Sequence, residues 1–248
     1  MKTCSPPPVS LLTLVCVLAL AAGCGDDPAR PPADSGFVIA GSVTDALGGP
    51  VAGAAILLDL AFDAVNKAAS MPPADVIRFS LAEAGAVSLT LLDACHEDTL
   101  RRWELDLDGG AHSVVWDGTD DDGRELTDRS LWAVLATADT TAERTLAVAR
   151  NSGDEDGDFA TWDHAHVSEH VRVQATTDAD GWFRIVRPCL GFGTTFPTVD
   201  EEGAVTGETM IAWRVRAWAY HPDHLPTCST WRELDPETGG MVSVILGD

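Results

Sequence analysis

Apolar and polar residues alternate with a period of two over most of the chain after residue 36. The segment VIRFSL at 76–81 and the segment AVSLTLL at 86–92 both show this pattern, and the alternate apolar residues are Ile77, Phe79, Leu81, Val87, Leu89 and Leu91. Such alternation, punctuated by Gly, Asp and Pro, is typical of half-buried β-strands. Because each strand has only a narrow apolar face, the strands are expected to form packed sheets. The chain is therefore predicted to be all-β, with a helical signal only within residues 60–70.

The first 36 residues depart from this pattern. Residues 9–23, VSLLTLVCVLALAAG, form an apolar run that is short for a transmembrane helix. The run leads into LAAGC, which resembles the lipobox of bacterial lipoproteins, where the signal is cut before the cysteine and the cysteine is lipidated; here that residue is Cys24. The alternative is an ordinary secretory signal followed by a chance cysteine. We expect a signal peptide at 1–23 and a flexible Pro/Asp-rich tether at 24–36.

The charge balance narrows the range of partners. The chain carries 39 acidic and 16 basic residues, a formal net charge of −23. This balance argues against nucleic-acid binding, which needs clustered Lys and Arg. The expected partners are membrane lipid through Cys24 and an unidentified protein or glycan. The expected location is the cell envelope, with a lipid anchor, at the outer membrane or cell surface of a Gram-negative bacterium.

Residues 76–137 resemble the FlgD-like immunoglobulin-like module. The pattern begins with an I-x-F-x-L strand and continues with a Gly turn, V-x-L-x-L-x-D, G-x-H-x-V-x-W-D-G and an acidic D-x-x-G turn. The matching residues are Ile77, Phe79, Leu81, Gly85, Val87, Leu89, Leu91, Asp93, Gly110, His112, Val114, Trp116, Asp117, Gly118, Asp122 and Gly123. The usual Gly-Val-Tyr of the last strand is replaced by SLW at 130–132. The resemblance implies an Ig-like sandwich over about 72–150.

A second resemblance is split along the chain. Residues 38–58 are similar to the opening of a carboxypeptidase regulatory-like domain, G-x-V-x-D-x-x-G-x-P-x-x-G-A, with one extra residue, Gly49. The continuation of that family, T-D-x-D-G-x-F, occurs only at 177–183. The simplest interpretation is a prealbumin-like β-sandwich formed by 37–62 and 171–248, with the Ig-like sandwich nested inside it. Residues 151–170 then form an acidic, His-rich connector. The alternative is a split without a shared sheet, which would leave a marginal isolated hairpin.

Three cysteines remain once Cys4 and Cys16 leave with the signal and Cys24 serves as the anchor. A disulfide is permitted outside the cytoplasm. We expect Cys189 to pair with Cys228, because both lie in the predicted prealbumin-like module. Cys95 is then expected to be a buried thiol.

Two segments are candidate metal sites. Asp154, Asp156 and Asp158 alternate as in a calcium loop, but the Gly and Glu that an EF-hand needs are absent. The segment DHAHVSEH contains three histidines and the motif H-x-x-E-H, which serves zinc proteases when it lies on a helix; the candidate ligands are His164, His166 and His170. The following VRVQATT favours a strand, where the histidines would lie on a polar outer face. We expect no required cofactor, and Ca or Zn (or Cu) is the alternative.

Two further segments call for interpretation. In AWRVRAWAY at 212–220, the outer face could form a platform for a sugar or an acidic ligand, or could be covered; its residues are Arg214, Arg216, Trp218 and Tyr220. The acidic stretch VVWDGTDDDGREL at 114–126 does not fit a calcium loop, and its Asp-Gly pairs favour a solvated hairpin turn.

No nucleophile elbow, phosphate loop or dinucleotide fingerprint occurs in the sequence. The regulatory-like resemblance implies a sandwich without the catalytic zinc site of the carboxypeptidases. The expected function is therefore non-enzymatic: a structural, adhesion or binding module of the cell envelope. Glycan binding is the first alternative, and metal binding by the histidine or aspartate clusters is the second.

Overall fold

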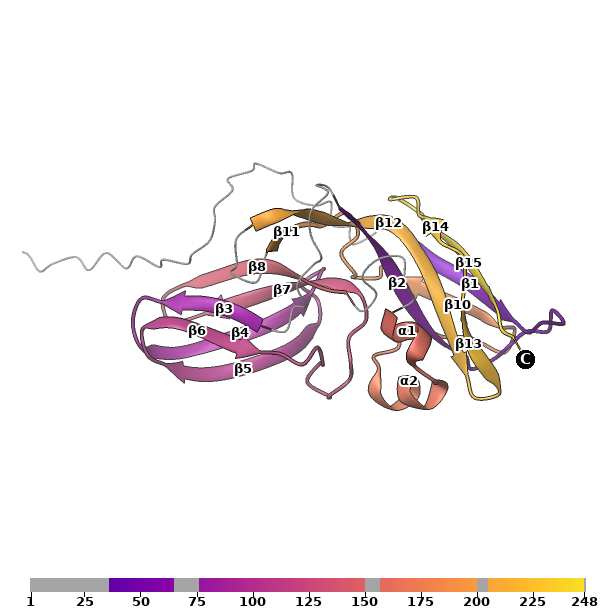
Figure 1. Ribbon diagram of the computed structural model, residues 1–248, viewed down its shortest axis with the longest axis horizontal. Helices are drawn as coiled ribbons and strands as arrows, with labels where there is room; N and C mark the ends of the chain where they lie inside the picture. Colours follow the sequence, from indigo (N-terminus) through magenta and orange to yellow (C-terminus); the bar gives the residue numbers. More distant parts are fainter. Residues whose placement is uncertain (1–35, 65–75, 150–156, 200–204, 248) are drawn as a thin grey trace, which may run out of the picture.

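The computed structural model describes residues 36–64, 76–149, 157–199 and 205–247. Strands dominate these residues, and the only helices among them are two short ones. The all-β prediction is confirmed (Figure 1). The predicted signal peptide, Cys24 and the tether lie outside the described residues. No helix in the described ranges is long and apolar enough to cross a membrane.

The first sandwich consists of two sheets that face each other. One sheet has the order β10 (Trp182–Val186), β1 (Val38–Thr44), β15 (Gly239–Ile245). The other has the order β11 (Thr195–Val199), β12 (Val205–His221), β2 (Ala55–Ala64), β9 (Ala175–Thr176), and β12 also pairs with β13 (His224–Cys228) and β14 (Arg232–Glu233). The apolar faces of both sheets form one core, in which Ile39 and Val242 of the first sheet lie with Leu58 and Val215 of the second.

The second sandwich lies between β2 and the two helices in the chain. A two-stranded sheet of β3 (Val76–Leu81) and β6 (Gly110–Val115) faces a sheet with the order β5 (Thr99–Leu107), β4 (Gly85–Asp93), β7 (Arg129–Ala136), β8 (Thr141–Val148). The alternating apolar residues form its core, including Ile77, Leu89, Leu91 and Leu131. Trp116 is also buried there, and its indole N–H donates to the carbonyl of Thr119 at 2.8 Å.

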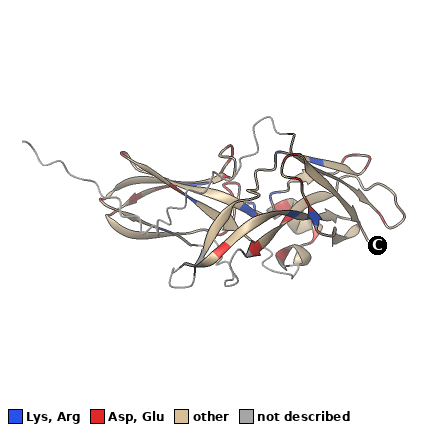
Figure 2. Ribbon diagram, turned by 90° about the horizontal axis from the view of Figure 1, so that it is seen from above, with Lys and Arg blue, Asp and Glu red and all other residues tan. Residues whose placement is uncertain are grey.

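Strands from before and after the second sandwich share both sheets of the first. β1 pairs antiparallel with β10 and parallel with β15, and β2 pairs antiparallel with β12 over most of its length. The chain therefore leaves the first sandwich after β2, builds the second sandwich and then returns. Figure 1 shows the two sandwiches side by side along the long axis. Figure 2 shows acidic residues spread over both of them, many in loops and turns.

Two segments depart from the expected secondary structure. Residues 60–64, where a helical turn was expected, continue strand β2. The segment expected to place histidines on a strand instead forms helix α2 (His164–His170), after the short helix α1 (Gly157–Thr161). Asp163 caps α2 by accepting a hydrogen bond from the backbone N–H of His166 at 2.8 Å. The valines that favour a strand begin only after the helix, at Val171, which is already extended, and within the helix Val167 is buried against the sheet.

Candidate functional site

Of the two alternatives for the outer face of β12, the covered face is the one that the structure shows, because α1 and α2 lie over the outer face of β2 and β12. Trp218 and Tyr220 do point to the face opposite the main core, but they are buried with Phe159 and Val167 of the helices. The Tyr220 hydroxyl donates to the carbonyl of Phe159 at 2.7 Å. Burial raises the pKa of this hydroxyl. Neither aromatic ring is available to a ligand.

The two arginines of that predicted platform are engaged in ion pairs and ring stacking. Arg216 is buried and pairs with the buried carboxylate of Asp59. Its guanidinium lies 5.5 Å from the ring centre of Trp218 and 4.9 Å from that of Trp231. Arg214 pairs with Asp63 at 3.2 Å and also lies over Trp231, at 5.6 Å. The four residues of the predicted platform therefore hold the covered face together.

The histidine cluster lies on helix α2 rather than on a strand. The i, i+4 spacing puts His166 and His170 on one face, with ring centres 5.4 Å apart. His166 Nε2 lies 3.2 Å from Oε1 of Glu125, in the loop between β6 and β7, and the His166 ring packs against that of Trp162 in a tilted arrangement, with ring centres 5.2 Å apart. Within the described ranges, no three His, Cys, Asp or Glu side chains are grouped so that they could hold a metal ion.

The other candidate metal ligands are dispersed or not described. His164 is the first residue of α2, and Asp158 is an exposed residue of the first turn of α1. Asp154 and Asp156 lie outside the described residues. The structure therefore does not bring these aspartates and histidines together as one site in the part of the chain that it describes.

The predicted Cys189–Cys228 disulfide is wrong, as is the predicted thiol at Cys95. Cys95 and Cys189 form the disulfide, with a Cα–Cα distance of 5.3 Å and a sequence separation of 94. Cys95 lies in the turn between β4 and β5 of the second sandwich, and Cys189 follows β10 of the first. Cys228 keeps its thiol and lies in β13 opposite Trp218. The disulfide thus joins the two sandwiches, whereas the prediction kept it within one.

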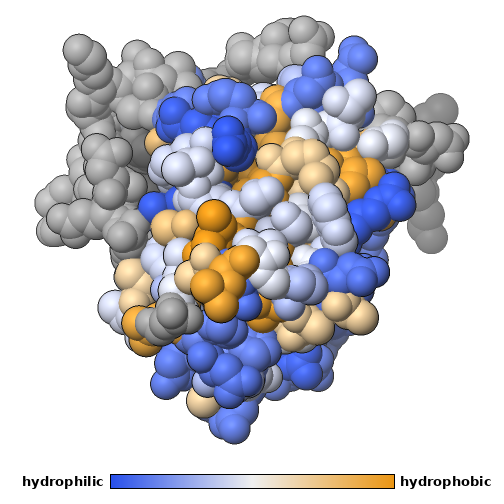
Figure 3. All heavy atoms as spheres, turned by 90° about the vertical axis from the view of Figure 1, so that its right-hand side faces the viewer, coloured by the Kyte–Doolittle hydropathy of each residue, from blue (hydrophilic) through white to orange (hydrophobic). Residues whose placement is uncertain are grey.

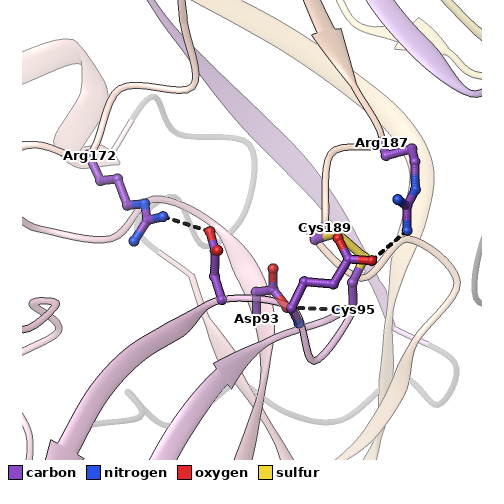
Figure 4. The surroundings of a disulfide bond; sticks show 7 residues. Asp93, Cys95, Arg172, Arg187 and Cys189 are labelled. Carbon is purple, nitrogen blue, oxygen red and sulfur yellow. Dashed lines mark hydrogen bonds and ion pairs between the residues drawn. A yellow bond between two sulfur atoms is a disulfide. The ribbon is translucent and has the colours of Figure 1, made fainter. Parts of the chain in front are cut away.

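Two ion pairs flank this disulfide (Figure 4). Arg187 pairs with Glu97 at 2.7 Å, and Arg172 pairs with Asp98 at 2.9 Å. Both carboxylates come from the β4–β5 turn. Arg187 directly follows β10 of the first sandwich, and Arg172 lies in the segment between α2 and β9 that leads into it. The turn itself is held by Asp93, whose Oδ1 accepts the backbone N–H groups of Cys95 at 3.1 Å and Glu97 at 2.9 Å.

Buried polar groups extend the junction beyond the disulfide. The backbone N–H of Leu60 donates to Asp128 at 3.3 Å, and the N–H of Ser130 donates to the carbonyl of Leu190 at 2.8 Å. Next to them, Arg129 is buried and donates to the carbonyl and hydroxyl of Thr127. Desolvation, reinforced by Arg172, lowers the pKa of Arg129 to about 10. The first two of these contacts tie the start of β7 in the second sandwich to β2 and to the segment after β10 in the first.

A hollow of about 300 Å³ lies at this junction. Its charged lining consists of three arginines and three carboxylates, and these are Arg129, Arg172, Arg187, Asp93, Glu97 and Asp98. Because Arg172 and Arg187 are paired with Asp98 and Glu97, most of this charge is already neutralised within the protein. The arrangement is suited to holding two modules together. Sequence reasoning missed these residues, since they are scattered charges; the paired Arg187 and Glu97, for example, are 90 positions apart.

The acidic stretch 114–126 forms a turn, as expected. The sequence predicted that this turn would be solvated, but part of it is buried. Asp117 accepts hydrogen bonds from the hydroxyl and backbone N–H of Thr119, which lower the pKa of its carboxyl. Asp120 is buried, and its Oδ1 accepts the backbone N–H groups of Asp122 and Arg124. The turn docks on α2, where the Glu125 N–H donates to the carbonyl of His170 at 2.6 Å.

In comparisons with known proteins, no family model, no curated protein and no solved structure matches the chain.

Proposed function

We propose that this protein is a non-enzymatic, lipid-anchored component of the bacterial cell envelope, in which two joined β-sandwiches form a structural or binding module. The lipobox-like LAAGC supports the anchor, and the Pro/Asp-rich run after Cys24 supports a tether between membrane and fold. The resemblances to FlgD-like and carboxypeptidase regulatory-like modules support an accessory role for the two sandwiches.

The observation that carries this proposal is the junction between the sandwiches. The Cys95–Cys189 disulfide crosses from one sandwich to the other, with the Arg187–Glu97 ion pair beside it. Disulfides persist in oxidising compartments and are rare in the cytosol. Interfaces between domains usually permit relative motion unless they are large and hydrophobic. A covalent bond across such an interface restrains that motion, as a spacer or a presenting module requires.

Metabolic labelling tests the anchor. The full chain is expressed in a bacterial host that has the lipoprotein-processing enzymes, in the presence of radioactive palmitate. We expect label in the wild-type protein, accumulation of the uncleaved precursor with globomycin, and loss of label in Cys24→Ser.

Cys16→Ser is the matched control, because it removes another cysteine of the predicted signal peptide, and this variant should keep the label. Label that persists in Cys24→Ser, or a wild-type protein without label, would show that the protein is not anchored through this residue.

A further inference from the structure

The three-stranded sheet β10–β1–β15 has an outer face that no described segment covers. The side chains that point outward from β10 and β15 are well exposed: Trp182 at 48%, Val186 at 56%, Met241 at 55% and Ile245 at 64%. Figure 3 views the molecule from the side on which this sheet lies in Figure 1, and hydrophobic and weakly polar residues occupy much of the middle of that view. Contiguous exposed apolar surface of this kind marks interaction sites.

The register of the strands makes this face a trough. Val38, Ala40 and Ser42 point outward from the central strand β1 and are small or medium in size. Ala40 lies between Arg184 and Met241, and Ser42 lies between Trp182 and Ser243. Trp182, Arg184 and Val186 of β10 therefore form one wall along a low floor, and Met241 and Ile245 of β15 stand on the other side with Ser243 between them. A linear polymer can lie along a trough that follows a strand, and it makes more contacts there than it would on a flat surface.

The wall on the β10 side combines an aromatic ring with a cation. Trp182 and Arg184 are two residues apart on one strand, so their Cβ atoms project from the same face about 6.6 Å apart. The Arg184 side chain makes no ion pair or hydrogen bond with any described residue. An open hollow of about 430 Å³ lies beside the pair, and Ala40, Thr176 and Asp178 also line it. The site therefore offers a stacking surface, a hydrogen-bonding cation and nearby hydroxyl and carboxylate groups.

The charge of this face differs from that of the molecule. The outward positions of β1, β10 and β15 contain no Asp or Glu, and Arg184 is their one charged residue. The chain as a whole carries −23. An anionic polymer would be repelled over most of the surface and least along these three strands, where the Arg184 guanidinium can pair with a carboxylate although Asp178 lies at the edge of the same hollow.

We propose that the trough on β10–β1–β15 binds an acidic polysaccharide, with a sugar ring stacked on Trp182 and an acid group of the chain paired with Arg184. Trp suits this role, because its indole is a large flat apolar surface with a polar N–H. The proposal rests on the proposed function as an envelope binding module and names its ligand class. The sugar platform considered as an alternative at 214–220 is covered, whereas the face on β10–β1–β15 is open.

Affinity electrophoresis tests the proposal with the full chain in a non-ionic detergent. Native gels contain polygalacturonate, the neutral polysaccharide dextran or no polymer. We expect polygalacturonate to retard the wild-type protein and dextran to have little effect. Trp182→Ala and Arg184→Gln should each weaken the apparent affinity for polygalacturonate about tenfold. Val115→Ala, which alters an exposed apolar residue of the second sandwich, should behave as wild type.

Three outcomes would overturn the proposal. The first is wild-type mobility that polygalacturonate does not change. The second is retardation that survives in both Trp182→Ala and Arg184→Gln, with circular dichroism showing that the variants are folded. The third is a wild-type protein that is dimeric, that becomes monomeric in Ile245→Asp and whose mobility polygalacturonate does not change. The trough would then be a self-association surface.

The same gels distinguish a failure of the polysaccharide proposal from a failure of the proposal that Cys24 is lipidated. Cys24→Ser should be retarded like the wild type, because the trough does not depend on the lipid. Loss of palmitate label with retained retardation would support both proposals, whereas a labelled protein that polygalacturonate does not retard would overturn only the ligand.

Discussion

Gly41 shows how a single position in the first sandwich depends on its neighbours. It lies in the middle of the central strand β1, and a Cβ at this position would be 1.9 Å from the carbonyl oxygen of Val242 and 2.5 Å from the ring of Phe183. The carbonyl belongs to the paired strand β15 and cannot move away without breaking the ladder. The first glycine of the regulatory-like pattern is therefore required here by close backbone approach.

Gly41→Ala is expected to lower the free energy of unfolding by about 3 kcal/mol, because the added methyl group overpacks the contact between β1 and β15. Thermal or denaturant unfolding monitored by circular dichroism measures the change. Gly85→Ala is the matched control, since a methyl group added there would meet no atom within 4 Å, and its change should stay within about 0.5 kcal/mol. Equal effects of the two substitutions would contradict this account of Gly41.

At the scale of elements, helices α1 and α2 act as a third layer on the first sandwich. Phe159 of α1 is fully buried against Trp218 and Trp162, with ring centres 6.4 Å and 5.2 Å away. Its carbonyl accepts the hydrogen bond from the Tyr220 hydroxyl. These two short helices therefore remove from solvent the face of β12 that would otherwise expose two large aromatic residues.

Phe159→Ala is expected to destabilise the protein by about 3–5 kcal/mol, the range for deleting a fully buried aromatic side chain. Tryptophan fluorescence should shift to longer wavelength, because Trp218 and Trp162 gain contact with water. Unfolding curves and emission spectra provide the two measurements. Ser168→Ala, an exposed change on α2, should leave both nearly unchanged; a Phe159→Ala protein with wild-type stability would show that the helices do not form this cover.

At the scale of the whole molecule, the disulfide and its ion pairs join two sandwiches that the sequence presents as separate patterns. The chain already crosses between the sandwiches after β2 and before the helices, and Cys95–Cys189 adds a third, covalent connection. Reduction would leave the two cores intact, since neither core cluster contains a cysteine. The effect of reduction is therefore expected mainly at the junction.

Peptide mapping under non-reducing conditions should recover a Cys95 peptide linked to a Cys189 peptide, and Cys228 should be alkylated once the protein is denatured. Dithiothreitol should lower the melting temperature, because a disulfide that closes a loop of this length contributes about 2–4 kcal/mol. Cys95→Ser should reproduce the effect of the reductant, and Cys228→Ser should not. Recovery of a peptide linking Cys189 to Cys228 would refute the pairing.

Much of the fold could be predicted because strand alternation is a local property. Ile77, Leu89 and Leu91 lie on apolar faces that can be read from each strand alone, and all three are buried in the core of the second sandwich. A side chain on a strand points to one of two faces with a period of two, whatever the rest of the chain does. The all-β class follows from this property, as does the opposite orientation of Trp213 and Trp218 along β12.

The candidate sites could not be predicted in the same way, because they depend on which distant segments meet. Trp218 and Tyr220 face away from the main core as expected, but only the tertiary structure places Phe159 over them. Cys95 meets Cys189 because the β4–β5 turn docks beside the end of β10, a contact that no local pattern encodes. Residues 164–170 are helical with Val167 packed against the sheet, and the extended backbone that the valines favour begins only at Val171. Local alternation thus determined the strands, and long-range packing decided what covers them, what joins them and which face stays open.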